Sequence, residues 1–350
     1  LTGSIDGGGG ADTLVASDVP TLFALSSNNA GSATNLNGTF ANVESLAGNA
    51  SDDVFDLTGG SLSGGIDGGM GNDTLLSGDA INQFVMTGPN AGSATGINGA
   101  AGFVDVENIV GNTQSDTLTF GPGGSLSGTF AAAGGTDVIN GADSNTSFLI
   151  NGPDAGNSTS LGSFTGVESL VGGSMDDEFI LFSVPFAGSI DGQAGANSLR
   201  SIFDGLDFQV TAPDAGNVEG TTTFSGIGTL AGGFGDDTFT LIAPGTLSGE
   251  VRGGSGDDTL AAADVATAFD VTGPGSGTMT GVALGFSQIE NLVGGSAADQ
   301  FTLNGGTLPG VVDGAGGVDT LTGDNVLNGF LITGMDEGDA TGTGGFRGIE

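Results

Sequence analysis

Val43-Glu44-Ser45-Leu46 opens the pattern that decides the fold, because close copies of this string recur along the whole chain. The copies are Val106-Glu107-Asn108-Ile109, Val167-Glu168-Ser169-Leu170, Ile227-Gly228-Thr229-Leu230 and Ile289-Glu290-Asn291-Leu292, and Ile349-Glu350 begins a further one. The step from one copy to the next is nearly constant, as these positions show. The chain of 350 residues is therefore a tandem array of nearly six repeats of about 61 residues.

Two series of phenylalanines keep the same step. One series is Phe23, Phe84, Phe148, Phe208, Phe269 and Phe330, and the other is Phe40, Phe103, Phe164, Phe224, Phe286 and Phe346. Phenylalanine at a fixed place in every repeat is typical of a buried position rather than of a ligand site. We expect each series to stack in one interior column.

A shorter period lies inside the repeat. Gly-rich turns that end in Asp or Asn recur with gaps that alternate between 20–21 and 40–43 positions, as in Gly232-Gly233-Phe234-Gly235-Asp236-Asp237 and Gly253-Gly254-Ser255-Gly256-Asp257-Asp258. Short runs that alternate polar and apolar residues follow these turns, as in Asp237-Thr238-Phe239-Thr240-Leu241. A step of about 20 residues with glycine at the corners is the size of one coil of a parallel β-helix.

The sequence therefore predicts an all-β, right-handed parallel β-solenoid of about 20 residues per coil. A right-handed coil is expected because parallel crossovers are right-handed. A propeller is the competing repeat architecture, and the short internal step counts against it. We expect residues 1–350 to form one continuous domain, cut as a window from a longer solenoid.

Composition excludes several classes of function. The chain has 41 acidic residues against three basic ones, a net charge of −38, and it contains no Cys or His. Phosphate neutralisation needs basic residues, so we expect no nucleic-acid partner. A Cys/His zinc site and a His-dependent catalytic triad cannot be built. No apolar run reaches the length of a membrane span, so no membrane insertion is expected.

The Gly-Gly-x-Gly-x-Asp turns resemble the RTX calcium-binding repeats of secreted bacterial proteins. The resemblance departs from RTX blocks in spacing, because those blocks repeat a nonapeptide in tandem, and residues 192–199 lack the Asp. The whole repeat more closely resembles the β-strand repeats of giant bacterial surface adhesins and filamentous-haemagglutinin-like proteins. This second resemblance covers the full chain and implies an extracellular or cell-surface protein.

The RTX resemblance implies Ca²⁺ at the turns, with candidate ligands Asp12, Asp53, Asp73, Asp116, Asp137, Asp177, Asp237, Asp258, Asp299 and Asp319. The short gaps between turns would stack Asp53 with Asp73, Asp116 with Asp137, Asp177 with Asn197, Asp237 with Asp258, and Asp299 with Asp319. Stacked carboxylates repel unless a proton or a cation lies between them. The alternative is that each Asp only shapes its turn by accepting backbone N–H bonds.

Glutamate also recurs at a fixed place in the repeat. The residues are Glu44, Glu107, Glu168 and Glu290. Charged side chains are mostly exposed in folded proteins, so we expect these four at solvent-facing strand positions.

Near-identical repeats without a unique constellation favour a structural rod in an extracellular fibre, sheath or adhesin stalk, and not an enzyme. Its partners would be continuing repeats or copies of itself end to end, and extracellular glycans. The alternative function is a glycan-binding or ice-binding solenoid. A polysaccharide-active β-helix enzyme is disfavoured because basic residues to hold an acidic substrate are nearly absent.

Overall fold

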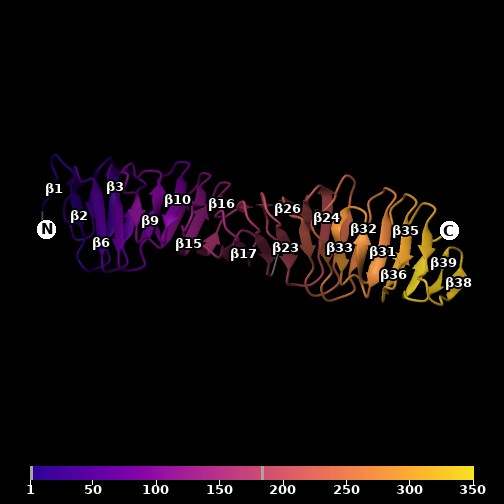
Figure 1. Cartoon of the computed structure of the whole chain (residues 1–350). Coiled ribbons are helices and arrows are strands. Elements are labelled where there is room, and N and C mark those ends of the chain that lie inside the picture. Colours follow the sequence, from indigo (N-terminus) through magenta and orange to yellow (C-terminus); the bar gives the residue numbers. More distant parts are fainter. Residues whose placement is uncertain (1–2, 183–184) are drawn as a thin grey trace. The chain divides into compact units, whose positions relative to one another are not determined.

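The computed structural model describes residues 3–182 and 185–350. The described residues form strands and turns without any helix, and each of the forty strands belongs to one of two mostly parallel sheets of twenty strands (Figure 1). The all-β prediction is confirmed, and the sheet arrangement is consistent with a β-solenoid.

Contacts divide the chain into two compact units. The first comprises Leu1–Phe148 with Asp154–Ser174, and the second comprises Leu149–Pro153 with Met175–Glu350. The two units are described separately below, and the single continuous domain stays a prediction.

The strands of the first unit are short and evenly spaced. They are β1 (Ile5–Asp6), β2 (Thr13–Val15), β3 (Leu22–Ser27), β4 (Ala30–Ala33), β5 (Phe40–Ala41), β6 (Ser45–Asn49), β7 (Val54–Asp56), β8 (Ile66–Gly69), β9 (Thr74–Leu76), β10 (Gln83–Gly88), β11 (Ala91–Ala94), β12 (Phe103–Val104), β13 (Asn108–Asn112), β14 (Thr117–Phe120), β15 (Leu126–Ala133), β16 (Val138–Asn140), β18 (Gly156–Ser158), β19 (Leu161–Thr165) and β20 (Ser169–Val171); β17 (Ser147–Ile150) spans the point where the units divide.

The second unit contains the remaining strands. They are β21 (Glu178–Leu181), β22 (Ser189–Asp191), β23 (Ser198–Ser201), β24 (Asp207–Ala212), β25 (Ala215–Val218), β26 (Thr222–Ser225), β27 (Thr229–Ala231), β28 (Thr238–Leu241), β29 (Val251–Arg252), β30 (Thr259–Ala261), β31 (Ala268–Gly273), β32 (Ser276–Met279), β33 (Val282–Ser287), β34 (Asn291–Val293), β35 (Gln300–Leu303), β36 (Val311–Asp313), β37 (Thr320–Thr322), β38 (Phe330–Gly334), β39 (Glu337–Ala340) and β40 (Gly345–Arg347).

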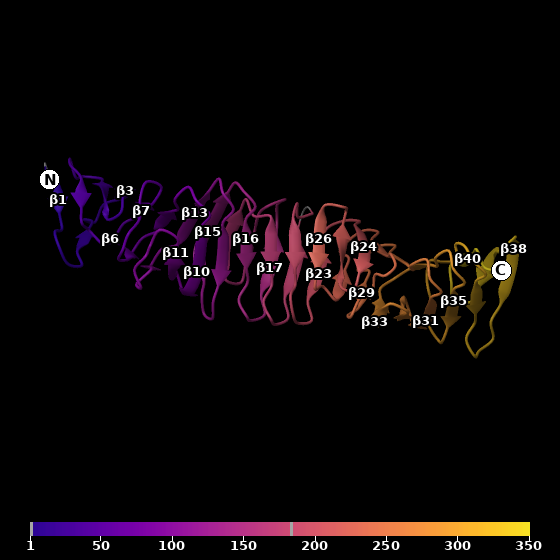
Figure 2. The ribbon, with the colours of Figure 1, turned by 90° about the horizontal axis from the view of Figure 1, so that it is seen from above.

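In both units the chain passes back and forth between the two sheets, and parallel neighbours are in register. Leu46 pairs with Ile66 in one sheet and Phe55 pairs with Leu75 in the other, so each of these short steps advances the numbering by twenty. The next parallel neighbour of Leu75 in β9 is Ile109 in β13, which lies thirty-four positions later in the sequence. The uniform coil length expected from the sequence is therefore not seen, because short and long steps alternate. Figure 2 shows the short strands following one another along each unit.

The long steps exist because each repeat contains a three-stranded antiparallel meander that the sequence analysis did not predict. In the first unit β10, β11 and β12 turn back on one another within one sheet, and β10 and β12 then pair in parallel with β14 and β8. The tight turn between β10 and β11 contains Asn90 at φ 50°, in the left-handed region that Asn tolerates. The recurring Gly-Pro-Asn-Ala-Gly string marks this hairpin.

The expectation that each phenylalanine series forms one column is wrong. Phe23 lies in β3 of one sheet, whereas Phe84, one repeat later, lies in β10 of the other. Between them the chain crosses an odd number of times, so successive repeats begin in opposite sheets. The column that forms instead joins Phe23 to Phe55, with rings 5.3 Å apart and nearly parallel, and continues to Leu75.

The core of each unit lies between the two sheets. Phe84, Phe130, Phe208 and Phe239 are fully buried, and the alternation of buried and partly exposed residues along each short strand follows the two-residue period of a strand. The Gly-rich turns lie at the strand ends and hold the acidic residues described next.

Candidate functional site

The candidate ligands lie directly before strands, and nearly all of them point inward. Asp73 precedes β9 and Asp258 precedes β30, and each residue is 0% exposed. The other candidates are buried to a similar degree except Asp12, which is half-buried. Nine buried carboxyl groups in turns require polar partners, because burying an unpaired charge is costly.

The structure brings all five predicted pairs together through the backbone. The amide of the first member donates to an Oδ1 of the second, and the N···O distances are 2.7 Å for Asp53–Asp73, 2.6 Å for Asp116–Asp137, 2.8 Å for Asp177–Asn197, 2.8 Å for Asp237–Asp258 and 2.7 Å for Asp299–Asp319. We call each such series a carboxyl ladder. Its hydrogen bonds join successive layers of the stack, and the bonded residues are 20 or 21 positions apart in sequence.

The ladders extend beyond these pairs at both ends. Thr21 donates its amide N–H to Asp53 Oδ1 at 2.7 Å, so the ladder begins one layer earlier. At the other end Asp73 donates its amide N–H to Glu107 Oε2 at 2.8 Å.

The same bond links four further pairs: Asp12–Glu44, Asp137–Glu168, Asp258–Glu290 and Asp319–Glu350. The solvent-facing interpretation of Glu44, Glu107, Glu168 and Glu290 is therefore wrong, because all four are half-buried acceptors that end a ladder. Their nearly constant offset from the preceding Asp turn, 31 to 34 positions, was the signal that could have identified them.

The second carboxyl oxygen divides the ladder residues into two kinds. Asp116, Asp237 and Asp299 each accept a backbone N–H on Oδ2 as well, from the residue four positions earlier, at 3.0, 2.9 and 2.7 Å. We call these doubly bonded residues. Six others have a buried Oδ2 without a hydrogen-bond partner among the described residues: Asp12, Asp53, Asp73, Asp137, Asp258 and Asp319.

Asn197 shows which groups surround the Oδ2 position of a ladder residue. It takes the place of Asp in a ladder, and its Nδ2 donates to the carbonyl oxygens of Gly192 at 2.7 Å and Gly226 at 3.0 Å. The position is therefore lined by backbone acceptors. An amide satisfies them, whereas an ionised carboxylate cannot.

Burial shifts the acid–base behaviour of three of these groups. Removal from water raises the pKa of Asp73, Asp137 and Asp258 to about 6, and one accepted backbone N–H on each opposes the shift. Nearby negative charge adds to the rise: Glu107 beside Asp73, Glu168 beside Asp137, and Asp237 beside Asp258. Burial also raises the pKa of the doubly bonded Asp237.

A glycine five positions before most ladder residues makes room for the carboxyl group. A Cβ on Gly68 would lie 2.7 Å from Asp73 Oδ2, and one on Gly253 would lie 2.5 Å from Asp258 Oδ2, closer than real Cβ contacts. This contact explains the first glycine of the Gly-Gly-x-Gly-x-Asp turn at Asp73 and Asp258, since a Cβ on Gly68 or Gly253 would meet the carboxyl group.

The donor set at the turns fits calcium poorly. Calcium takes six to eight oxygen ligands. Over residues 3–182 and 185–350, no group of three or more acidic, His or Cys side chains is placed to bind one metal ion. The turns of Asp73, Asp258 and Asp319 each bring one unpaired carboxyl oxygen together with a backbone carbonyl. Calcium at the ten aspartates stays a prediction.

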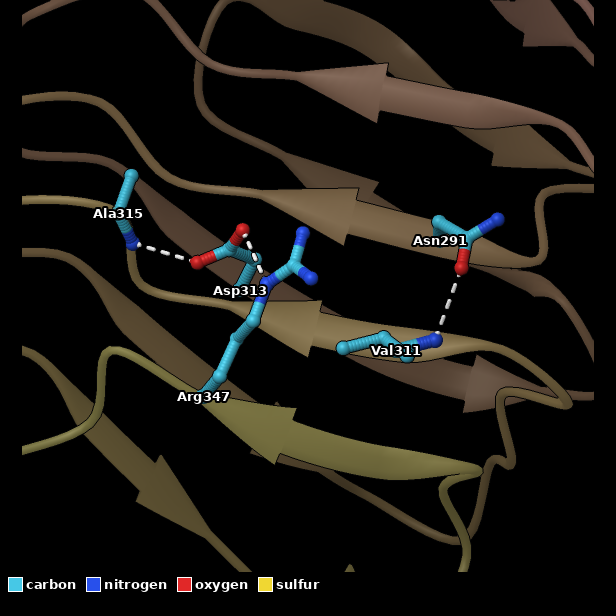
Figure 3. A network of polar contacts seen from close by, with 5 residues as sticks. All are labelled: Asn291, Val311, Asp313, Ala315 and Arg347. Carbon is cyan, nitrogen blue, oxygen red and sulfur yellow. Dashed lines mark hydrogen bonds and ion pairs between the residues drawn. The ribbon is translucent and has the colours of Figure 1, made fainter. Parts of the chain in front are cut away.

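The basic residues lie outside the ladders and are paired with acids on the strands. Arg347 Nε lies 2.7 Å from Asp313 Oδ2, while the other oxygen of Asp313 accepts the Ala315 N–H at 3.0 Å (Figure 3). One strand further, the side chain of Asn291 accepts the Val311 N–H at 2.9 Å. Arg200 pairs with Glu178 and Arg252 with Glu250. The Arg200 and Arg347 pairs link adjacent strands, whereas Arg252 pairs with a residue two positions earlier in its own segment.

In comparisons of the sequence, no family model matches the chain and no curated protein matches it. Among the described residues there is no helix long and apolar enough to cross a membrane.

Proposed function

We propose that this chain is a structural segment of an extracellular bacterial fibre, sheath or adhesin stalk, built as a right-handed β-solenoid. Its role is to maintain the length and shape of the fibre or stalk. Its partners are continuing repeats or further copies of the chain, end to end. Extracellular glycans are the expected contacts of its surface.

One observation carries the proposal: the same buried residues return at equivalent places in successive repeats. In the first unit Asp73 donates to Glu107 and Asp137 donates to Glu168, each closing a ladder in the same way. In the second unit Phe208 stacks on Phe239 and Phe269 stacks on Phe301, with ring centroids 4.8 Å apart in both pairs. Repeats that share the same internal contacts favour a structural role. Catalysis would need one distinct group of reactive side chains at a single place.

The crossings between the sheets support the solenoid and its hand. Each short step, such as Phe55 to Leu75, leaves one sheet, visits the other and returns to a parallel neighbour. Parallel crossovers of this kind are right-handed in nearly all proteins. The long steps add a meander to the same path without changing its direction.

The charge supports an extracellular setting. A net charge of −38 with no Cys keeps the surface soluble and independent of redox conditions. Like-charged segments repel laterally, which favours growth along the chain over bundling.

Electron microscopy of the native source, with antibody against residues 3–182, tests the proposal. We expect label spaced along filaments or stalks outside the cell. Label confined to soluble monomers, or to the cytoplasm, would contradict it. A β-solenoid that is intact in solution but absent from any filament would separate a correct fold from a wrong function.

A further inference from the structure

Two oxygen atoms meet at a buried point over Gly253. A Cβ on that glycine would lie 2.5 Å from Asp258 Oδ2, and the carbonyl oxygen of Gln288 would lie under 3.0 Å from the same point. Asp258 is 0% exposed, and its Oδ2 has no hydrogen-bond partner within the described chain. Carbonyl and carboxylate oxygens are both acceptors, so neither of these two oxygens can donate a hydrogen to the other.

The same arrangement recurs at two other turns. Asp73 Oδ2 and the Asp105 carbonyl converge over Gly68, and Asp319 Oδ2 and the Gly348 carbonyl converge over Gly314. The carbonyls come from residues with positive φ, 51° at Asp105 and 56° at Gln288, which turn the peptide into the site. A conformation disfavoured for these side chains is kept at each of them.

Asn197 supplies the missing hydrogen in the one ladder where it replaces Asp. Its Nδ2 and the Gly226 carbonyl converge over Gly192 in the same way, and Nδ2 donates to that carbonyl at 3.0 Å. The side chain itself carries the donor, and it bonds the carbonyl directly. The Oδ2 position of this ladder residue therefore suits a side-chain atom that donates a hydrogen bond.

We propose that in mildly acidic solution Asp73, Asp258 and Asp319 are neutral carboxylic acids in the folded protein, each donating its Oδ2–H to the facing backbone carbonyl. Oδ1 of the same group accepts the amide of the preceding layer, so one carboxyl group joins two segments, as the Asn197 amide group does. This inference is independent of the proposed function, because it concerns the protonation of the ladder.

The charges around these groups favour the neutral form. The residues that face Asp258 are Asp237, Glu290 and Asp236, and those that face Asp73 are Glu107, Asp53 and Asp52. All are acidic, and burial disfavours one more negative charge among them. The pKa of about 6 at Asp73 and Asp258 agrees with this arrangement.

The doubly bonded residues provide the matched contrast. Asp237 lies one layer from Asp258 and is 1% exposed, but both of its oxygens accept N–H groups, from Leu206 at 2.6 Å and Gly233 at 2.9 Å. An amide nitrogen there would face an N–H group. Asn should therefore fit at position 258 and not at position 237.

Thermal unfolding of Asp258→Asn and Asp237→Asn, each at about pH 5 and about pH 8 in chelator, tests the proposal. We expect Asp258→Asn to melt roughly 2 °C or more above the natural chain at about pH 8 and to have a clearly smaller advantage at about pH 5, where part of the natural chain's stabilisation has returned. Asp237→Asn should melt lower than the natural chain at both pH values. A carboxyl ¹³C titration should show a group near pH 6 that Asp258→Asn removes.

Two results would overturn the proposal. One is Asp258→Asn melting at or below the natural chain at about pH 8. The other is a cation in place of the proton: added Ca²⁺ would raise the melting temperature of the natural chain at that pH, and Asp258→Asn would abolish the rise.

Discussion

At the residue scale, glycine and aspartate are coupled across five positions. Gly68 has no side chain because Asp73 Oδ2 and the Asp105 carbonyl occupy the space over its Cα. Gly68, the first residue of the turn motif, is therefore required for packing. The coupling also explains why the turn motif begins with glycine at a position where the backbone conformation does not demand one.

Gly68→Ala should therefore destabilise the protein by about 1–3 kcal/mol, since overpacking forces backbone and carboxyl apart. Gly9→Ala is the control, because a Cβ on Gly9 meets nothing within 4 Å. Denaturant unfolding measures both. Equal losses in the two variants would show that the contact with Asp73 is not the cause.

The pairing of aspartates could be predicted from the sequence, and the bonding within each pair could not. The short gap between Asp53 and Asp73 places them in adjacent layers, as observed. Spacing does not tell whether a side chain accepts a neighbour's amide or points to solvent. For that reason Glu107 was misplaced, although it recurs as regularly as Asp73.

At the element scale, a phenylalanine ring lies over a glycine in four of the described meanders. In β32 a Cβ on Gly277 would lie 3.0 Å from the ring of Phe286 in β33, and in β25 one on Gly216 would lie 2.9 Å from the ring of Phe224. The ring covers a strand residue that has no side chain of its own. This contact accounts for the second phenylalanine series.

Phe286→Ala should cost about 3–5 kcal/mol, because a buried ring is lost and the glycine strand is uncovered. Leu284→Ala in the same strand is the control: Leu284 is 73% exposed, and its loss should change stability by less than about 0.5 kcal/mol. Chemical denaturation followed by circular dichroism gives both values. A Phe286→Ala variant as stable as Leu284→Ala would refute the role assigned to the ring.

The meander was missed because its sequence signal, Gly88-Pro89-Asn90-Ala91-Gly92 and its later variants, indicates a turn and no more. The Gly88-to-Gly92 string repeats with the period of the array, yet a turn does not say whether the next strand stays in the same sheet. In the structure Phe103 pairs with Gly92 in the hairpin and with Ile66 of the preceding layer, and a local turn signal predicts neither pairing. The phenylalanine columns were wrongly predicted for the same reason, because the meander makes the number of crossings between the two sheets odd in each repeat.

At the scale of the whole molecule, stability should fall as the solution becomes less acidic. The pKa of Asp73, Asp137 and Asp258 is about 6 in the folded chain against 3.8 for the ordinary side chain. The folded state thus binds more protons than the unfolded state between these values, and linkage makes stability decrease with rising pH there. Below about pH 4 the stabilisation is fully present, and it is lost as pH rises through about 6.

Melting temperatures across that range measure the effect. Surface repulsion from the net charge of −38 acts in the same direction, so the series is repeated in about 1 M salt, which screens exposed charges. The decrease should persist in salt because the carboxyl groups are buried. A melting temperature that rises between about pH 4 and about pH 6 would contradict the account.

The central claim is that the repeats are interchangeable structural units. The most direct measurement compares the thermal unfolding of the natural chain with a variant lacking residues 227–288, which joins Gly226 to Ile289, and with one in which this segment is duplicated. In the deletion variant Leu292 would take the place of Leu230 opposite Leu199. Both variants should keep a β-sheet spectrum and a cooperative transition within about 5 °C of the natural chain, as stacked repeats allow. Loss of the transition in both would contradict the claim.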